Sequence, residues 1–572
     1  MSLNLTPRGS LVARALWLVL LAALGVLIGL LAGCEVPAEP VLTPTSTRTP
    51  HPPTPTPSPV PSPTPTPAWP VTAGCGEEVV DRVCARLREA VEADPEHFVW
   101  NDTSLPDTSA PDTSASDVTV GVQASSGARP FGTWVYALVA PFLTLEDGVT
   151  AEALEAAWTG EAAGPFVDHP LVVSTDASRA LSLGNPTGAN VTMVGASDVL
   201  SEAMRIDGWA IVPFDELEPR WKVLRIDGVS PLDRILDLET YPLAQVAYLT
   251  AGERTDALPF LPHGVTNRDP ERLSVVMMTG VTALTRRTAV TMEQEGVQFP
   301  GRDVIGWMTE PDITHTSNEV SFSEDCPAPT GESTLVFCSD PNYFGLLEYV
   351  DIDVLELTGN HLLDWGVSAM EHSLRMYEER GVPTFGGGWN LEEAQKPLTV
   401  THGVHTFGFL GCNSVGPSYA WATGERPGAA PCDYELLTAQ VRRLRAEGII
   451  PIVTFQYLEV DQYAPTASQQ ATFRAVAEAG AAIVSGSQAH WPQGFDFHAD
   501  GFIHYGLGNL FFDQMQRLEY RQEFLDRHVF YDGRHISTEL LTAMLEDSAR
   551  PRPMTVEERR ALLTSTFAVS EW

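Results

Sequence analysis

Residues Val36 to Pro70 of this 572-residue chain are mostly proline, threonine and serine. Proline has no amide hydrogen and fixes one backbone angle, so a segment this rich in proline cannot build a helix or a sheet interior. We expect an extended, semi-rigid stalk over residues 34–72. Regular structure must then come from the roughly 500 residues that follow, a length that suggests two or more domains.

The residues before the stalk have the pattern of an export signal. Arg8 and Arg14 precede an apolar run from Ala15 to Ala32, and the run ends in Leu-Ala-Gly-Cys at residues 31–34. This order is typical of a secretory signal peptide, here residues 1–33. The four residues resemble a bacterial lipobox, which implies a lipid on Cys34 and attachment to the outer face of a membrane. An uncleaved membrane-spanning helix is the alternative, because about 18 apolar residues can cross a bilayer.

The remaining six cysteines favour an oxidising compartment. They form three pairs that are close in sequence, namely Cys75 with Cys84, Cys326 with Cys338, and Cys412 with Cys432. Secreted proteins use such disulfides commonly and cytosolic proteins rarely. Six cysteines allow many pairings, so the local pairing is a prediction. A thiolate zinc site is the alternative, although the sequence has no Cys-x-x-Cys pair.

Charge limits the partners of this chain. It has 74 acidic and 35 basic residues, a formal net charge of -39. Such a surface repels polyanions, so we expect no nucleic-acid partner. The charge leaves open a divalent cation, or a small anionic ligand at a local basic spot. The lipid would make the membrane a further partner.

Residues 73–261 are predicted to form a smaller α/β domain. Short apolar runs such as Trp134–Val139 indicate strands, and they alternate with helical patterns such as Ala151–Trp158. The segments Val139–Phe142 and Trp209–Phe214 resemble fragments of a periplasmic solute-binding lobe. A supporting domain without a ligand is the alternative.

Residues 274–545 are predicted to form a second α/β domain, followed by a tail or helix over residues 546–572. The apolar run Val275–Met278 indicates a strand, and Thr438–Glu447 is an amphipathic helix that ends at a glycine. Polar loops follow several of these strands. In α/β folds the chemistry lies in such loops.

Three polar motifs in these loops carry a family resemblance. They are Asn-His-x-x-Asp-x-Gly at residues 360–366, Gly-x-Asn-Leu-Glu-Glu-Ala at 388–394 and Gly-Leu-Gly-Asn-x-x-Phe-Asp-Gln at 506–514. In this order they resemble the CapA family of poly-γ-glutamate capsule synthesis proteins, which is related to the calcineurin-like metallophosphatases. The resemblance implies a four-layer α/β/β/α fold with two sheets packed face to face.

The resemblance also implies a site at the strand ends. Carboxylate, amide and imidazole groups there would hold one or two divalent ions, Mn, Mg or Zn, which polarise a substrate and acidify a bound water. It assigns His361 and Asp364 as catalytic, and Glu319, Asn360 and His490 as metal ligands. The substrate-binding candidates are Asn318, Arg286, Gln456, Glu459 and Asn390.

This chain departs from the family pattern at three positions. Val281 stands where the family has an aspartate, Gln456-Tyr457-Leu458 replaces His-Trp-Gly, and Gly-Ser-Gln-Ala-His at 486–490 replaces Gly-His-His-Pro-His. Valine cannot bind a metal and glutamine is a weak ligand. A single-metal site, or a binding pocket without metal, therefore fits better than a two-metal hydrolase.

Structural roles are the alternative for each candidate. Asn360 and His361 could complete a turn, Asp364 could cap a helix, and His490 could be a core histidine. The leading functional hypothesis is a cell-surface lipoprotein that makes or handles a poly-γ-glutamate-like extracellular polymer, with metal-dependent hydrolysis or transfer as its candidate activity. A non-catalytic surface binding protein for a polymer or small solute is the second hypothesis. The third is a solute-capture lipoprotein that feeds a transporter.

Overall fold

The computed structural model describes residues 2–4, 69–76, 79, 81–101, 116–181, 190–331 and 335–571. Apart from the backbone of β1 (Ser2–Asn4), which pairs with β20 (Leu398–His402), the predicted signal peptide with its cleavage site lies outside these residues. So do Cys34 and the stalk up to residue 68. The described residues from Trp69 onward belong to one compact unit. Within these ranges, no helix is both long and apolar enough to cross a membrane.

The N-terminal domain is built on a twisted sheet whose strands run in the order β3-β2-β4-β12-β5-β9-β7-β8. Their bounds are β2 (Val71–Cys75), β3 (Phe98–Trp100), β4 (Val118–Gly121), β5 (Arg129–Pro141), β7 (Leu171–Ser174), β8 (Val191–Val194), β9 (Trp209–Pro213) and β12 (Ala244–Thr250). Two short strands, β10 (Trp221–Val223) and β13 (Val265–Thr266), add to β5. β2 begins inside the last residues assigned to the stalk, because Val71 and Ala73 point into the core.

Four helices accompany this sheet. They are α2 (Asp81–Ala93), α3 (Ala151–Thr159), α4 (Thr175–Ala180) and α5 (Val199–Ile206). The Thr150 side chain accepts a hydrogen bond from the Ala153 amide and so caps α3. α2 buries Val83, Leu87 and Val91 at helical spacing. The predicted α/β class of this domain is confirmed.

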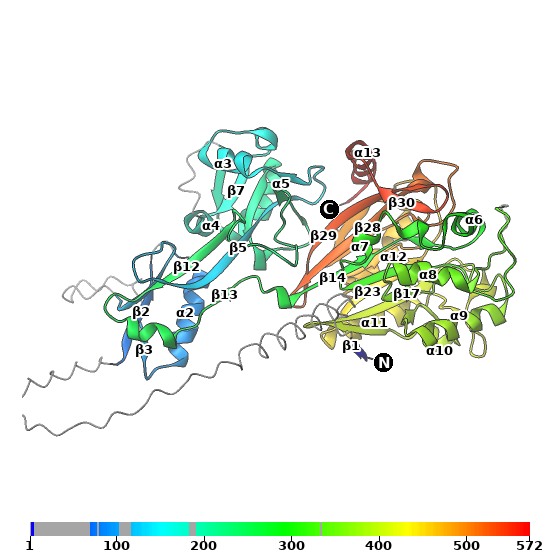
Figure 1. The fold of residues 1–572 in the computed structure, drawn as a ribbon, viewed down its shortest axis with the longest axis horizontal. Coiled ribbons are helices and arrows are strands. Elements are labelled where there is room, and N and C mark those ends of the chain that lie inside the picture. The colour runs from blue at the N-terminus through cyan, green and yellow to red at the C-terminus, as the bar shows by residue number, and fades with distance from the viewer. Residues whose placement is uncertain are drawn as a thin grey trace, which may run out of the picture. The chain divides into compact units, whose positions relative to one another are not determined.

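The C-terminal domain is built on two large sheets, and a short separate sheet pairs β19 (Gly387–Gly388) with β22 (Gly428–Ala429) (Figure 1). The seven-stranded sheet has the order β1-β20-β21-β23-β24-β26-β25, and the nine-stranded sheet has β18-β17-β16-β14-β28-β29-β30 with β15 and β27 beside it. The first sheet adds β21 (His405–Asn413), β23 (Ile450–Gln456), β24 (Ile483–Ser485), β25 (Phe495–His498) and β26 (Gly501–His504). The second comprises β14 (Leu273–Met278), β15 (Val281–Thr282), β16 (Ile313–Asn318), β17 (Val354–Glu356), β18 (Thr384–Phe385), β27 (Asn509–Phe511), β28 (Gln522–Tyr531), β29 (Arg534–Glu546) and β30 (Arg550–Pro553).

These two sheets pack face to face. Phe407 of β21 meets Phe530 of β28 with ring centroids 4.9 Å apart, and His504 of β26 hydrogen bonds to Asp526 of β28 at 2.6 Å. Helices α11 (Tyr434–Ala446) and α12 (Ala467–Glu478) cover the seven-stranded sheet, whereas α6 (Arg286–Glu295), α8 (Phe344–Tyr349) and α9 (Val367–Arg380) share a core with the other (Figure 1). The predicted four-layer α/β/β/α fold is confirmed.

The end of the chain joins this domain and does not form a separate tail. β30 adds a strand beside β29, and α13 (Val556–Phe567) follows it. A capping box between Thr555 and Glu558 starts α13, and Leu562 and Leu563 are buried. The segment predicted as a tail or helix is therefore a strand and a helix.

All six described cysteines form disulfides, in the local pairing expected from the sequence. The Cα atoms are 5.9 Å apart for Cys75–Cys84, 5.7 Å for Cys326–Cys338 and 5.0 Å for Cys412–Cys432. Each disulfide ties a strand or loop to the next element along the chain. The described cysteines therefore leave no thiolate for the alternative zinc site.

Candidate functional site

Parallel pairing brings the polar segments to one edge of the nine-stranded sheet. Thr282 of β15 lies beside Asn318 of β16, and the Glu319 amide donates to the Thr282 carbonyl at 2.9 Å. Val320 then pairs with His361. Gly359 permits this close approach, because a Cβ at that position would lie 2.7 Å from the Glu319 Cα. Glu319 and His361 therefore come from neighbouring strand ends.

Glu319 is a buried carboxyl group without a protein partner. Its side chain is 1% exposed, and neither carboxyl oxygen has a hydrogen-bond partner among the described residues. Burial raises the pKa of Glu319, although the positive charges of His490 and His361 act against this rise. A buried polar group without a partner costs about 1–3 kcal/mol, so this group needs an explanation outside simple packing.

His361 is oriented by a carboxylate. Its Nδ1 lies 2.6 Å from Asp364 Oδ2, and Asp364 also accepts from the Phe337 amide at 3.1 Å and from the Tyr419 hydroxyl at 3.2 Å. Burial acts to lower the pKa of His361, but the hydrogen bond to Asp364 and the charge of Glu319 raise it overall. Asp364 does not cap α9, whose N-cap residue is Gly366.

His490 approaches the same carboxyl group from the opposite sheet. Its Nε2 is 4.0 Å from Glu319 Oε1 and 3.8 Å from Glu459 Oε1. Its Nδ1 lies 2.6 Å from the amide oxygen of Asn509, whose own Nδ2 donates to the Tyr520 carbonyl at 2.9 Å. An amide oxygen only accepts, so Nδ1 carries hydrogen and Nε2 faces the two glutamates. His361 and His490 therefore both lie near the carboxyl group of Glu319.

Buried amide side chains add further unpaired polar atoms. Both amide atoms of Gln456, Oε1 of Gln488, and Oδ1 of Asn318 and of Asn360 lack hydrogen-bond partners in the part of the chain that the structure describes. Asn318 is held through its Nδ2, which donates to the Val320 carbonyl at 2.9 Å and to the Tyr377 hydroxyl at 2.8 Å. These strand-end segments thus offer both donors and acceptors to a polar ligand.

A second buried carboxylate supports these segments from beneath. Glu356, at the end of β17, accepts hydrogen bonds from His315, Thr358 and Ser487. Thr358 in turn lies 3.3 Å from Gln488 Nε2. Sequence reasoning assigned no role to Glu356 or Gln488. Two signals in the sequence could have indicated them. Glu356 is an acidic residue at the end of the apolar run of β17, and Gln488 lies two residues before His490.

Two predicted substrate-binding residues are used elsewhere. The Arg286 guanidinium pairs with Asp513 and lies over the rings of Phe337 and Phe512, with its Cζ 5.3 and 4.8 Å from their centroids. This pairing leaves Arg286 unsuited to capturing an anion. Asn390 caps α10 (Leu391–Ala394) by accepting from the Glu393 amide at 3.0 Å, a local structural role. Glu459 does reach the site, with its side chain 44% exposed.

The donor set does not fit the metal centre that the family implies. Within the described ranges, no group of three or more His, Cys, Asp and Glu side chains is arranged to hold a metal ion. The side chain at the family's aspartate position is the buried Val281, and amides occupy two histidine positions. Amides are weak ligands for transition metals.

Comparison with known protein families identifies the family of the C-terminal domain. Residues 275–514 match the family described as bacterial capsule synthesis protein PGA_cap. The C-terminal domain belongs to the CapA family. The capsule biosynthesis protein CapA of Bacillus anthracis is 23% identical over 330 residues, which cover 56% of this chain and 78% of that protein. The PGA biosynthesis protein CapA of Bacillus subtilis is 25% identical over 218 residues, and the match spans only 55% of its length and 38% of this chain.

Solved structures resemble smaller parts of the chain. An ABC-type phosphate transport receptor from Vibrio cholerae matches 34% of this chain and 93% of its own, with 12% identity and a TM-score of 0.27. The NAD nucleotidase NadN of Haemophilus influenzae matches 51% of this chain and 55% of its own, with 9% identity and a TM-score of 0.29. These likenesses are too distant to specify a ligand for either CapA-family or N-terminal residues.

Proposed function

We propose that this chain acts in the synthesis of an extracellular poly-γ-glutamate-like polymer, and that the Glu319–His361 region is where the polymer binds. Membership of the CapA family, together with the names of the two Bacillus relatives, supports the polymer. The signal-like N-terminus and the three disulfides support a location outside the cytoplasm, with Cys34 as the lipid attachment residue.

The observation that carries this proposal is the set of buried polar atoms without partners at the family's motif positions. Gln456 presents a free N–H₂ and a free carbonyl, and Glu319 presents two carboxyl oxygens without partners among the described residues. A polymer amide offers the complementary carbonyl and N–H. The Arg286 guanidinium, which could have attracted a polymer carboxylate, is paired with Asp513. We therefore infer that the site recognises the uncharged amide linkage.

His361 gives this site a group that can move a proton. Asp364 holds Nδ1, so Nε2 is available to the ligand, and the raised pKa increases the protonated fraction of the ring. A protonated imidazole beside a bound amide can donate to its carbonyl or to a leaving nitrogen. Hydrolysis or transfer at the linkage is the reaction that this arrangement supports.

The proposal is tested by deleting the gene in its own bacterium and restoring the full chain with single substitutions. Glu319→Gln and His361→Gln should each lower the cell-surface polymer at least about tenfold, because each removes a group from the proposed site. Glu324→Gln and His263→Gln are matched controls at exposed positions and should restore wild-type levels. Wild-type polymer in both site variants would contradict the proposal.

Binding by the purified full chain separates the site from metal chemistry. Calorimetric titration with poly-γ-glutamate should give the same affinity with and without EDTA, because the proposed contacts are amide, carboxyl and imidazole groups. Loss of affinity on EDTA treatment, restored by Mn²⁺, Mg²⁺ or Zn²⁺, would instead support the metal-dependent activity of the family.

A non-catalytic binding role is the second candidate. Val281, Gln456 and Gln488 stand where the family has ionisable side chains, and this observation favours binding without turnover. The two candidates differ in the behaviour of His361→Gln. If the chain only binds the polymer, His361→Gln should keep the polymer affinity within about twofold of the wild type. In that case neither the wild type nor His361→Gln should change the length of the polymer on incubation.

A further inference from the structure

A cavity of about 760 Å³ opens between the N-terminal and C-terminal domains, away from the strand-end site. Its floor comes from β28, β29 and β30, and α7 (Ile305–Met308) and α13 contribute from the same domain. The N-terminal domain closes it with the segment after β5 and with β10 and β11 (Arg225–Ile226). A volume of this size is typical of sites for small molecules.

The walls of the cavity are apolar over much of their area. Trp307, Leu541, Met554 and Phe567 line it and are only partly buried within the protein. Ile235, at 93% exposure, lines it from the N-terminal domain. When an apolar ligand covers apolar side chains that contact solvent inside a cavity, the free energy of the complex falls. The body of a ligand here should therefore be apolar.

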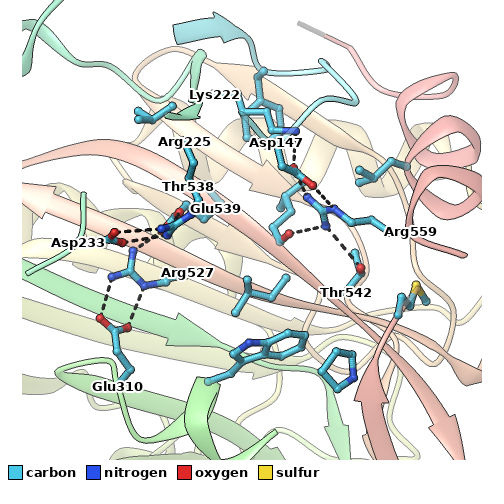
Figure 2. Close-up of a pocket in the computed structure, with 18 of the residues that line it drawn as sticks. Asp147, Lys222, Arg225, Asp233, Glu310, Arg527, Thr538, Glu539, Thr542 and Arg559 are labelled. Atoms are coloured by element: carbon cyan, nitrogen blue, oxygen red, sulfur yellow. Dashed lines mark hydrogen bonds and ion pairs between the residues drawn. The ribbon is translucent and has the colours of Figure 1, made fainter. Parts of the chain in front are cut away.

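One end of the cavity carries more positive than negative charge. Asp147 accepts from Lys222 Nζ at 2.8 Å and from Arg559 at 2.7 and 2.8 Å, so one carboxylate faces two cations (Figure 2). Burial acts to raise the pKa of Asp147, but these two partners lower it to about 2. The neighbouring Arg560 is neutralised separately by Glu146. Burial lowers the pKa of Lys222, although its contact with Asp147 acts against this lowering. With Lys222 and Arg559 both protonated, this end keeps one unbalanced positive charge.

The other end has the opposite imbalance. Arg225 pairs with Asp233 and Glu539, and Arg527 pairs with Glu539 and with both oxygens of Glu310. Two cations therefore face three carboxylates. Arg234 also lines the cavity, but it is neutralised by Asp312. Figure 2 shows this group and the Asp147 group on opposite sides of the cavity.

We propose that this cavity binds a zwitterion with an apolar body, of the chemical class of a short apolar peptide with free ends. Its carboxylate would lie beside Lys222 and Arg559, and its ammonium group beside Glu310 and Glu539. Complementary charges at two separated points fix the orientation of a ligand and select against molecules that lack one of them. This site is independent of the strand-end site and of the polymer.

The test is calorimetric titration of the full chain with leucyl-alanyl-leucine in four forms. The forms are the free tripeptide, the N-acetylated peptide, the C-amidated peptide and the peptide with both caps. The free form should bind, each single cap should weaken binding about tenfold, and both caps should weaken it about a hundredfold. Absence of binding by the free form at millimolar concentration, or equal affinity for all four forms, would overturn the proposal.

Two substitutions assign the ends. Arg559→Gln should remove only the preference for the free carboxylate over the C-amidated end. Glu310→Gln should remove only the preference for the free amine over the N-acetylated end. Arg560→Gln and Glu557→Gln are matched controls on α13 that do not line the cavity, and they should keep both preferences. Equal effects of the site and control variants would count against the assignment. If a variant fails to fold, the titration of the wild-type chain with the four peptide forms still tests the proposal.

Discussion

Glu319 and Arg527 are both buried ionisable side chains of the C-terminal domain, but their surroundings differ. Glu319 has no hydrogen-bond partner among the described residues, whereas Arg527 donates to Glu310 at 3.0 Å through two nitrogens and also to Glu539. The first belongs to the strand-end site and the second to the cavity between the domains. The two regions therefore handle polar groups in opposite ways.

This difference separates two routes to binding. At the strand ends, each unpaired buried atom costs about 1–3 kcal/mol of stability, a cost that a ligand with matching donors and acceptors would offset. At the cavity, the ion pairs already satisfy the polar atoms, so only the unbalanced charge at each end is available to a ligand. Removing a polar group should consequently have opposite effects on stability in the two regions.

The largest effect is expected for Arg527→Met. The substitution leaves Glu539, 17% exposed, without one of its two cations, and it leaves Glu310 without its bidentate partner. Breaking a buried pair on one side costs about 3–5 kcal/mol. The free energy of unfolding from urea titration should fall by about 3 kcal/mol. Arg179→Met, at an exposed loose pair, should change it by less than about 0.5 kcal/mol.

A smaller effect of opposite sign is expected for Glu319→Gln. The pKa of Glu319 is raised in the folded protein, so its stabilising contribution is complete below about pH 4.5 and is lost as the pH rises through the folded pKa. The amide variant cannot ionise. Relative to the wild type it should become more stable as the pH rises from 5 to 8.

The measurement is urea unfolding of both proteins at pH 5 and pH 8. The raised pKa of His361 also makes the wild type less stable with rising pH, because its contribution is complete below about pH 6.5 and is lost above the folded pKa. His361 is present in both proteins, so the comparison isolates Glu319 and its coupling to that ring. A difference that stays constant between the two pH values would contradict the buried, partnerless Glu319 described here. Glu324→Gln supplies the exposed control.

Much of the strand-end site could be predicted from the sequence because its residues follow strands in a fixed order. Asn360, His361 and Asp364 lie within one motif, and parallel strands bring their carboxyl ends to one edge. The family register then located Glu319 and His490. The disulfides could be predicted for a similar reason, because each pair is close in sequence.

The remaining features depend on contacts that local patterns do not encode. Arg286 pairs with Asp513, 227 residues away. Because of this pairing, a residue predicted to bind substrate has a structural role. Asp147 and Arg559 are 412 residues apart, and they meet only because α13 packs against the N-terminal domain. The cavity has no sequence signature, since its charges come from many segments spread between Asp147 and Arg559. Burial and long-range pairing decide both cases.

The smallest effects distinguish a structural amide from an amide at the site. Asn390→Ala removes the cap of α10 and should cost about 1 kcal/mol in urea unfolding, without a change in affinity for poly-γ-glutamate. Asn360→Ala removes a buried oxygen that has no partner among the described residues, so it should not destabilise the protein and should raise the free energy of unfolding by about 1 kcal/mol. Its affinity for the polymer should fall about tenfold, because the ligand loses a hydrogen bond in a buried place. If Asn360→Ala is the more destabilised variant and binds normally, then Asn360 is a turn residue and the unpaired atoms at the strand ends serve no ligand.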